Sequence, residues 1–157
     1  MLDRDLKCLV TGSNGYVGST IANYLSQRGR VIYQLKHLTT KPPSTHNEFV
    51  LPYALETEID EEIFDNKDVL IHCAYDFRWT KWEDIKRVNV DGSLRLLESA
   101  RKSGVHSIIY ISSISAYDGC RSMYGKAKLM IEEGALQIGA VVIRPGLVYG
   151  SNTGGMI

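Results

Sequence analysis

Tyr124 and Lys128 are two side chains suited to proton transfer, and they stand four residues apart. On a helix this spacing places the phenol and the ammonium on one face. A neighbouring cation favours the phenolate and lowers the pKa of a tyrosine from about 10 toward neutrality, as acid–base work on a carbonyl group requires. The chain has nine tyrosines, so such a spacing also arises by chance and needs support from its surroundings.

Two serines upstream supply that support. Ser112 and Ser113 directly follow an apolar run at 108–111. At the carboxyl edge of an open parallel sheet, their hydroxyls would reach the place where such sheets bind ligands. A serine there can donate a hydrogen bond to a substrate oxygen as charge develops on it. The alternative interpretation is a serine-rich turn at the end of a strand.

The segment 11–18, TGSNGYVG, has three glycines at the spacing of a dinucleotide-binding loop. Gly12 permits a tight turn, Gly15 lets backbone N–H groups approach a pyrophosphate, and Gly18 lets the following helix pack closely on the sheet. The anion would then lie at the positive end of that helix. We therefore expect a cofactor-binding loop rather than a simple turn, made of Gly12, Ser13, Asn14, Gly15, Tyr16, Val17 and Gly18.

The end of the second expected strand indicates which dinucleotide is bound. Domains that hold NAD place an Asp or Glu about 20 residues past the loop, where it binds the ribose hydroxyls. Here the sequence at 34–37 is QLKH, so Lys36 and His37 stand where that carboxylate would be. A cation at this place favours a 2′-phosphate, so we expect NADP, with NAD as the alternative. The competing interpretation is that Lys36 points into solvent.

The elements that must position these residues alternate along the chain. Short apolar runs predict six strands, at 6–10, 31–35, 49–53, 69–73, 107–111 and 140–143. Amphipathic stretches between them predict helices on both faces of the sheet. The sequence therefore predicts an α/β fold with a doubly wound, mostly parallel sheet of about six strands, and residues 1–157 form one domain.

Three helices are expected in detail. The first follows the glycine loop, with Val17 and Ile21 on its apolar face. A long helix is expected over 81–102, with a capping box formed by Thr80 and Glu83. Another begins near Ser122, and its core face is predicted to contain Met123, Ala127, Met130 and Ile131. Around the third expected strand, a loop is expected at 39–45 and a short acidic helix at 56–65.

Composition excludes several classes of partner and site. Lys plus Arg and Asp plus Glu both total 18, so no net charge favours nucleic acid or an anionic membrane. The charged N-terminus and the lack of a long apolar run argue against a signal peptide or membrane span, which predicts a cytoplasmic protein. The cysteines are expected to be reduced thiols and no metal site is expected, because Cys8, Cys73 and Cys120 lie far apart.

The order of the motifs resembles the extended short-chain dehydrogenase/reductase family of the epimerase/dehydratase type, over nearly the whole chain. Its patterns TGxxGxxG, DVxxHxAA, NVxGTxxLLxAA, SSxxxY, SxYGxSK and RPxxVYG are similar to segments 11–18, 68–74, 89–100, 112–117, 122–128 and 144–150. Such a resemblance implies a Rossmann domain that binds NAD(P). It also implies hydride transfer between nicotinamide and a hydroxyl or carbonyl carbon of a small molecule such as a nucleotide sugar.

The resemblance implies a role for each matching residue. Tyr124 would be the acid–base group, Lys128 would bind the nicotinamide ribose, and Ser113 would polarise the reacting oxygen. Asn89 would brace the active site. In the DVxxHxAA strand, Cys73 and Ala74 are expected to lie beside the cofactor.

The sequence also departs from the family pattern. The segment 51–55 lacks the aspartate that usually touches adenine, and Tyr75 replaces a small residue near the nicotinamide. The sequence stops at Ile157, where the family continues into a substrate domain. Two functions therefore stay open. The first is an NAD(P)-dependent oxidoreductase or epimerase domain, and we expect the 157 residues by themselves to be inactive. The second is a non-catalytic NAD(P)-sensing module. The uncovered cleft wall leads us to expect a homo-oligomer.

Overall fold

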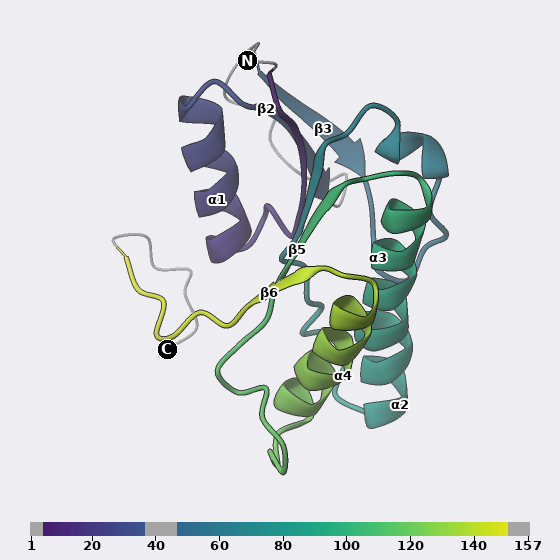
Figure 1. Ribbon diagram of the computed structural model, residues 1–157. Coiled ribbons are helices and arrows are strands. Elements are labelled where there is room, and N and C mark those ends of the chain that lie inside the picture. The colour runs from purple at the N-terminus through teal and green to yellow at the C-terminus, as the bar shows by residue number, and fades with distance from the viewer. Residues whose placement is uncertain (1–4, 37–46, 151–157) are drawn as a thin grey trace.

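The computed structural model describes residues 5–36 and 47–150, which fold around one parallel sheet (Figure 1). Its six strands follow the order β3-β2-β1-β4-β5-β6, and every pair is parallel. The strands are β1 (Lys7–Thr11), β2 (Val31–Lys36), β3 (Glu48–Pro52), β4 (Val69–His72), β5 (Ser107–Ile111) and β6 (Val141–Ile143). This order is that of the doubly wound Rossmann sheet, which reverses between β1 and β4 and opens a crevice there.

Helices cover the two faces of the sheet unequally (Figure 1). On one face lies α1 (Tyr16–Gln27), which packs on the cluster formed by Cys8, Val10, Ile32 and Ile71. The other face carries α2 (Trp82–Ile85), the π-helical segment η2 (Lys86–Asp91), α3 (Gly92–Lys102) and α4 (Met123–Gln137). The larger hydrophobic core lies beneath these helices.

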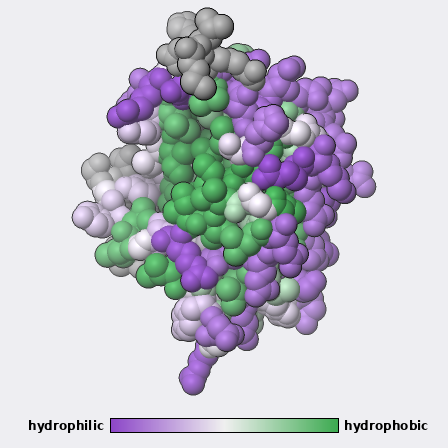
Figure 2. All heavy atoms as spheres, in the orientation of Figure 1, coloured by the Kyte–Doolittle hydropathy of each residue, from purple (hydrophilic) through white to green (hydrophobic). Residues whose placement is uncertain are grey.

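The face that carries α1 leaves apolar side chains uncovered. Figure 2 shows hydrophobic residues gathered across the middle of this view, over the sheet between α1 and α4. Val141 and Ile143 of β6 are exposed, as is Leu147 in the segment that follows. Among the described residues, none of the helices is long and apolar enough to cross a membrane.

The sequence placed all six strands within a residue or two of their observed bounds. The sheet is fully parallel rather than mostly so, since each of its five strand pairs is parallel. The expected acidic helix at 56–65 is a single 3₁₀ turn, η1 (Glu61–Phe64), capped by the side chain of Asp60. The expected loop at 39–45 lies outside the described residues.

Two detailed predictions about the helices are wrong. The capping box does not form, because α2 begins at Trp82 with Lys81 as its N-cap, and a lysine side chain has no oxygen to accept the backbone N–H bonds. Met123 is 46% exposed at the first position of α4 and not part of its core face. Ala127 and Ile131 are buried as expected, and Met130 packs partly against the core.

Candidate functional site

A pocket of about 860 Å³ lies along the carboxyl edge of the sheet. The carboxyl end of β2 and the segments that follow the other five strands contribute to its lining, as expected for a ligand site in an open parallel sheet. Most of the predicted site residues line it: Gly12, Asn14, Gly15, Tyr16, Val17, Gly18, Lys36, Cys73, Ala74, Ser113, Tyr124 and Lys128. Phe77, Ile114 and Leu147 line it as well, and the sequence alone gave no role to these three residues.

At one end of the pocket, Gly12 allows the backbone to turn close to the end of β4. Its φ of 68° is in the left-handed region, and a Cβ there would lie 2.7 Å from the backbone nitrogen of Ala74. The carbonyl of Gly12 accepts the Gly15 N–H at 2.9 Å, which closes the turn before α1 starts at Tyr16. The first turn of α1 then presents its N–H groups toward the pocket, as an anion-binding loop requires.

Ser13 lies behind this loop rather than on the pocket wall. It is buried, and its Oγ has no hydrogen-bond partner among the described residues. A buried hydroxyl without a partner has a desolvation cost, but Ser13 is not placed to meet a ligand in the pocket. The glycine turn alone fits a phosphate-bearing cofactor.

A buried imidazole joins the glycine loop to β4. His72 Nδ1 lies 2.6 Å from Thr11 Oγ1, and His72 Nε2 lies 2.8 Å from Ser93 Oγ on α3. The Thr11 hydroxyl already accepts the N–H groups of Cys73 and Ala74, so we assign its hydrogen to Nδ1. His72 is therefore a neutral structural residue that ties β1, β4 and α3 together.

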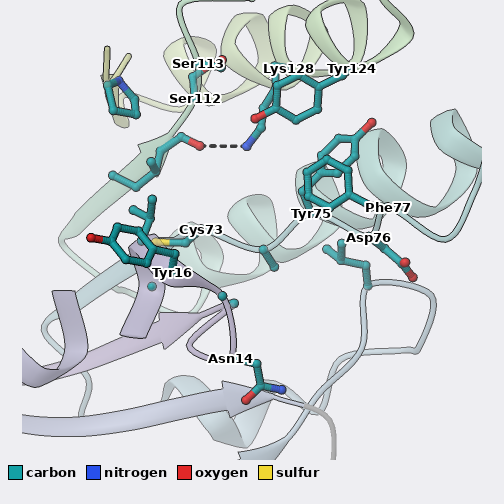
Figure 3. A pocket seen from close by; sticks show the side chains of 18 of the residues that line it. Asn14, Tyr16, Cys73, Tyr75, Asp76, Phe77, Ser112, Ser113, Tyr124 and Lys128 are labelled. Carbon is teal, nitrogen blue, oxygen red and sulfur yellow. Dashed lines mark hydrogen bonds between the residues drawn. The ribbon is translucent and has the colours of Figure 1, made fainter. Parts of the chain in front are cut away.

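At the opposite end of the pocket, α4 presents Tyr124 and Lys128 (Figure 3). Gly125 lets the first turn of α4 approach the loop after β5, because a Cβ there would lie 2.3 Å from the carbonyl oxygen of Ser115. The close approach of α4 to this loop brings Tyr124 beside Ser113. The Oγ of Ser113 accepts the N–H of Ser115 at 3.1 Å. The three expected active-site side chains therefore converge at the end of β5.

Lys128 is fixed inside the protein. It is 3% exposed, and its Nζ donates a hydrogen bond to the carbonyl oxygen of Ile111 at 2.9 Å. The rings of Tyr75, Tyr110 and Tyr124 surround the ammonium, with centroids 4.9 to 5.8 Å away. Burial lowers the pKa of Lys128 to about 8.

The pKa of Tyr124 differs from the sequence-based expectation. Burial raises it above its usual range, and hydrogen bonding with Ser113 offsets only part of that rise. The expected lowering by Lys128 does not occur here, because that ammonium is directed to the backbone of Ile111. At neutral pH the phenol therefore keeps its proton, which suits a proton donor.

An ion pair supports α4 from behind the site. Glu132, one turn after Lys128, is 3% exposed and accepts hydrogen bonds from Arg144 Nε at 2.8 and 3.1 Å. Burial raises the pKa of Glu132, but hydrogen bonds with Arg144 and Ser112 and the charges of Arg144 and Lys128 together bring the pKa below its ordinary value. The pair holds the segment after β6 against α4, at the side of the pocket.

Aromatic side chains after β4 form a wall next to Tyr124 (Figure 3). The Tyr75 ring meets the Tyr124 ring edge to face, with centroids 4.8 Å apart, and the Phe77 ring stacks on it at 5.7 Å. Phe77 is 54% exposed, so it presents an apolar surface to whatever enters this end. The sequence could have revealed Phe77, because it lies two residues after Tyr75. Both residues follow β4, the strand that ends beside the glycine loop.

Asn89 braces this wall and does not line the pocket itself. It is fully buried in η2, and its side chain forms two bonds with the backbone of Asp76. Asn89 Oδ1 accepts the Asp76 N–H at 2.6 Å, and Asn89 Nδ2 donates to the Asp76 carbonyl oxygen at 3.0 Å. The side chain of Asn89 therefore fixes the backbone between Tyr75 and Phe77.

The two predicted selectivity residues have different outcomes. Lys36 ends β2 and lines the pocket, on the part of the edge away from Tyr124. His37 lies outside the described residues. Beyond β3, the pocket is lined by Tyr53, Ala54, Leu55 and Glu56, none of which is the aspartate of the family pattern.

The sequence matches known proteins along most of its length. Residues 8–156 match the model of the NAD dependent epimerase/dehydratase family. The chain is 26% identical over 155 residues to a ceramide reductase of Caulobacter vibrioides, which covers 90% of this chain and 46% of that protein. It is 27% identical over 170 residues to the UDP-glucose 4-epimerase of Homo sapiens, covering 81% of this chain and 47% of that protein.

A solved structure shows the same arrangement. It is a short-chain dehydrogenase/reductase superfamily protein of Agrobacterium tumefaciens with bound NAD, and it superposes with a TM-score of 0.71 at 25% identity. The match covers 88% of this chain and 48% of that one. The chain therefore spans about half the length of these relatives.

Proposed function

The chain belongs to the NAD dependent epimerase/dehydratase family, and we propose that its pocket binds a nicotinamide dinucleotide for hydride transfer to or from a small molecule. The observation that carries this proposal is one continuous pocket. The anion-binding turn at Gly12 lines one part of it, and Ser113, Tyr124 and Lys128 line another. A relative of similar fold was solved with NAD, which supports the choice of ligand.

The pocket residues divide the work of binding. The glycine loop and the first turn of α1 would hold the pyrophosphate, and Cys73 and Ala74 would lie along the cofactor. Lys128 has one N–H bonded to Ile111, which leaves two for the hydroxyls of the nicotinamide ribose. Lys36 would meet the adenosine ribose, so we propose NADP rather than NAD as the preferred cofactor.

The bound cofactor supplies the nicotinamide ring as hydride donor or acceptor. In the direction of reduction, Tyr124 would donate its phenolic proton to the carbonyl oxygen of the substrate. The raised pKa of Tyr124 keeps that proton on the phenol at neutral pH. Ser113 donates a hydrogen bond to the same oxygen, which stabilises the charge that develops on it. The aromatic wall of Tyr75 and Phe77 excludes water from one side.

The substrate class stays a proposal. Relatives named a UDP-glucose 4-epimerase and a ceramide reductase support a hydroxyl or carbonyl compound, such as a nucleotide sugar. The second candidate is a non-catalytic NAD(P)-binding module, which would use the same pocket without turnover. We propose that the 157 residues alone turn over little substrate, self-associate through their exposed apolar face, and act in the cytoplasm.

Cofactor titration tests the proposal. Ligand binding adds about 2.7 kcal/mol of stability at a concentration 100 times the dissociation constant, so both dinucleotides should raise the melting temperature. We expect a larger rise with NADP+ than with NAD+, and Lys36→Asp should reverse the order. No rise with either would contradict dinucleotide binding. Cofactor oxidation with nucleotide sugars, run beside sedimentation, tests the proposed low turnover. Rapid turnover by a monomer of these 157 residues would contradict both the low turnover and the non-catalytic candidate.

A further inference from the structure

Three polar side chains on β2 and β3 form a continuous chain of hydrogen bonds. Gln34 Nε2 donates to Glu48 Oε2 at 2.8 Å, and Lys36 Nζ donates to Gln34 Oε1 at 3.0 Å. Gln34 and Glu48 are each 6% exposed, which is unusual for these residue types. Burying these two polar side chains has a desolvation cost, which the hydrogen bond between them offsets.

The sheet geometry explains why these residues meet. Gln34 and Lys36 are two residues apart on β2, so their side chains leave the same face of the sheet. This is the face of α1, since Ile32 lies on it and packs in the cluster beneath that helix. Glu48 lies opposite Ile32 in the parallel register with β3, so its carboxylate reaches the neighbouring Gln34 diagonally.

The donors and acceptors of this chain fix its direction. An ionised carboxylate can only accept hydrogen bonds, and an ammonium can only donate them. Gln34 lies between the two, so its amide NH2 must face Glu48 and its carbonyl oxygen must face Lys36. A flipped amide would place donor against donor and acceptor against acceptor. The buried Glu48 therefore determines that Gln34 presents an acceptor to the ammonium.

The result is a lysine held at a defined place on the pocket wall. Lys36 is the last residue of β2, it is partly buried, and it lines the pocket. Gln34 accepts one of its three N–H groups, and two stay available to a ligand. A free lysine loses side-chain freedom when it binds, and a lysine already held by a hydrogen bond loses less.

We propose that Gln34 and Glu48 are positioning residues that hold the Lys36 ammonium for the 2′-phosphate of NADP, and so contribute to selectivity against NAD. This inference rests on the proposed function, which assigns Lys36 to the adenosine ribose. Neither Gln34 nor Glu48 touches the ligand in this scheme. They act through Lys36, so their removal should weaken binding of the phosphorylated cofactor alone.

The test compares dissociation constants for NADP+ and NAD+ measured by calorimetry on the whole chain. Gln34→Met removes the acceptor of the Lys36 hydrogen bond and keeps a side chain of similar length. This single variant leaves the Glu48 carboxylate without the Gln34 donor, so a double variant, Gln34→Met with Glu48→Met, removes that carboxylate as well. We expect both to weaken NADP+ binding about threefold to tenfold and to leave NAD+ binding unchanged. Lys36→Met should abolish the preference. Lys67→Met, which removes the same charge before β4 and away from the pocket, is the matched control.

Electrostatics makes the double variant decisive. Glu48 is negative. If charge were the only effect, removing Glu48 would therefore strengthen the binding of a phosphate. Weaker NADP+ binding in the double variant therefore supports positioning, and unchanged or stronger binding overturns it. If Lys36→Met loses the preference while both other variants keep it, the positioning role is wrong and the proposed function stands. If the wild-type chain binds both cofactors equally, the NADP assignment itself is wrong, and the positioning role with it.

Discussion

The neutral imidazole of His72 should make the fold sensitive to mild acid. Burial, together with the charge of Lys128, lowers the pKa of His72 from 6.5 to about 3. Both ring nitrogens are already used, because Nδ1 accepts from Thr11 and Nε2 donates to Ser93. A second ring proton on Nδ1 would face the Thr11 hydroxyl hydrogen, so protonation must break this buried contact.

The expected size follows from proton linkage. The folded-state pKa lies below the unfolded-state value, so between about pH 3 and 6.5 the unfolded chain binds more protons. Stability is therefore fully present above pH 6.5 and is lost as the pH falls. For this one group, the free energy of unfolding should fall by about 2 kcal/mol between pH 7 and pH 5. Most carboxylates titrate below this window.

Urea denaturation followed by circular dichroism at pH 7, 6 and 5 measures this loss. In His72→Gln the fall over the same range should shrink by about 2 kcal/mol, because no imidazole at this site titrates. His106→Gln, which removes an exposed imidazole before β5, is the control and should behave as the wild type. An equal fall in the wild type and in His72→Gln would refute the reasoning.

Three further predictions concern the pocket. Tyr124→Phe should leave cofactor affinity unchanged and reduce turnover at least about 100-fold in a catalytically active form of the protein, as steady-state kinetics would show. Gly12→Ala should abolish cofactor binding in calorimetry, because its Cβ would lie 2.7 Å from the Ala74 nitrogen and its φ of 68° strains an alanine. Asn89→Ala should destabilise the fold by about 1 to 3 kcal/mol in urea denaturation, because two hydrogen bonds to the Asp76 backbone are lost.

The strands and the glycine loop could be predicted because their signals are local. Each apolar run that is buried on both faces of a parallel sheet is visible in the sequence, and a glycine spacing between strand and helix is specific. The position of Tyr124 and Lys128 on one helix face followed from periodicity alone. These features need no knowledge of distant contacts.

What the sequence missed depends on residues far apart in the chain. The bond between Gln34 and Glu48 requires the register of β2 against β3, which periodicity does not reveal. The raised pKa of Tyr124 depends on burial, and on Lys128 being directed to Ile111 instead. The exposure of Met123 reflects its place at the very start of α4, where the turn has not yet met the core.

The π-helical segment η2 is a place where the chain should tolerate the deletion of one residue. A single π turn holds one residue more than an α turn, so it absorbs an extra residue without rotating the helix on either side. Deleting one residue from Lys86–Asp91 would let the turn close as an ordinary α-helix, with α2 and α3 kept in phase. In an uninterrupted α-helix the same deletion would rotate one flank by about 100°.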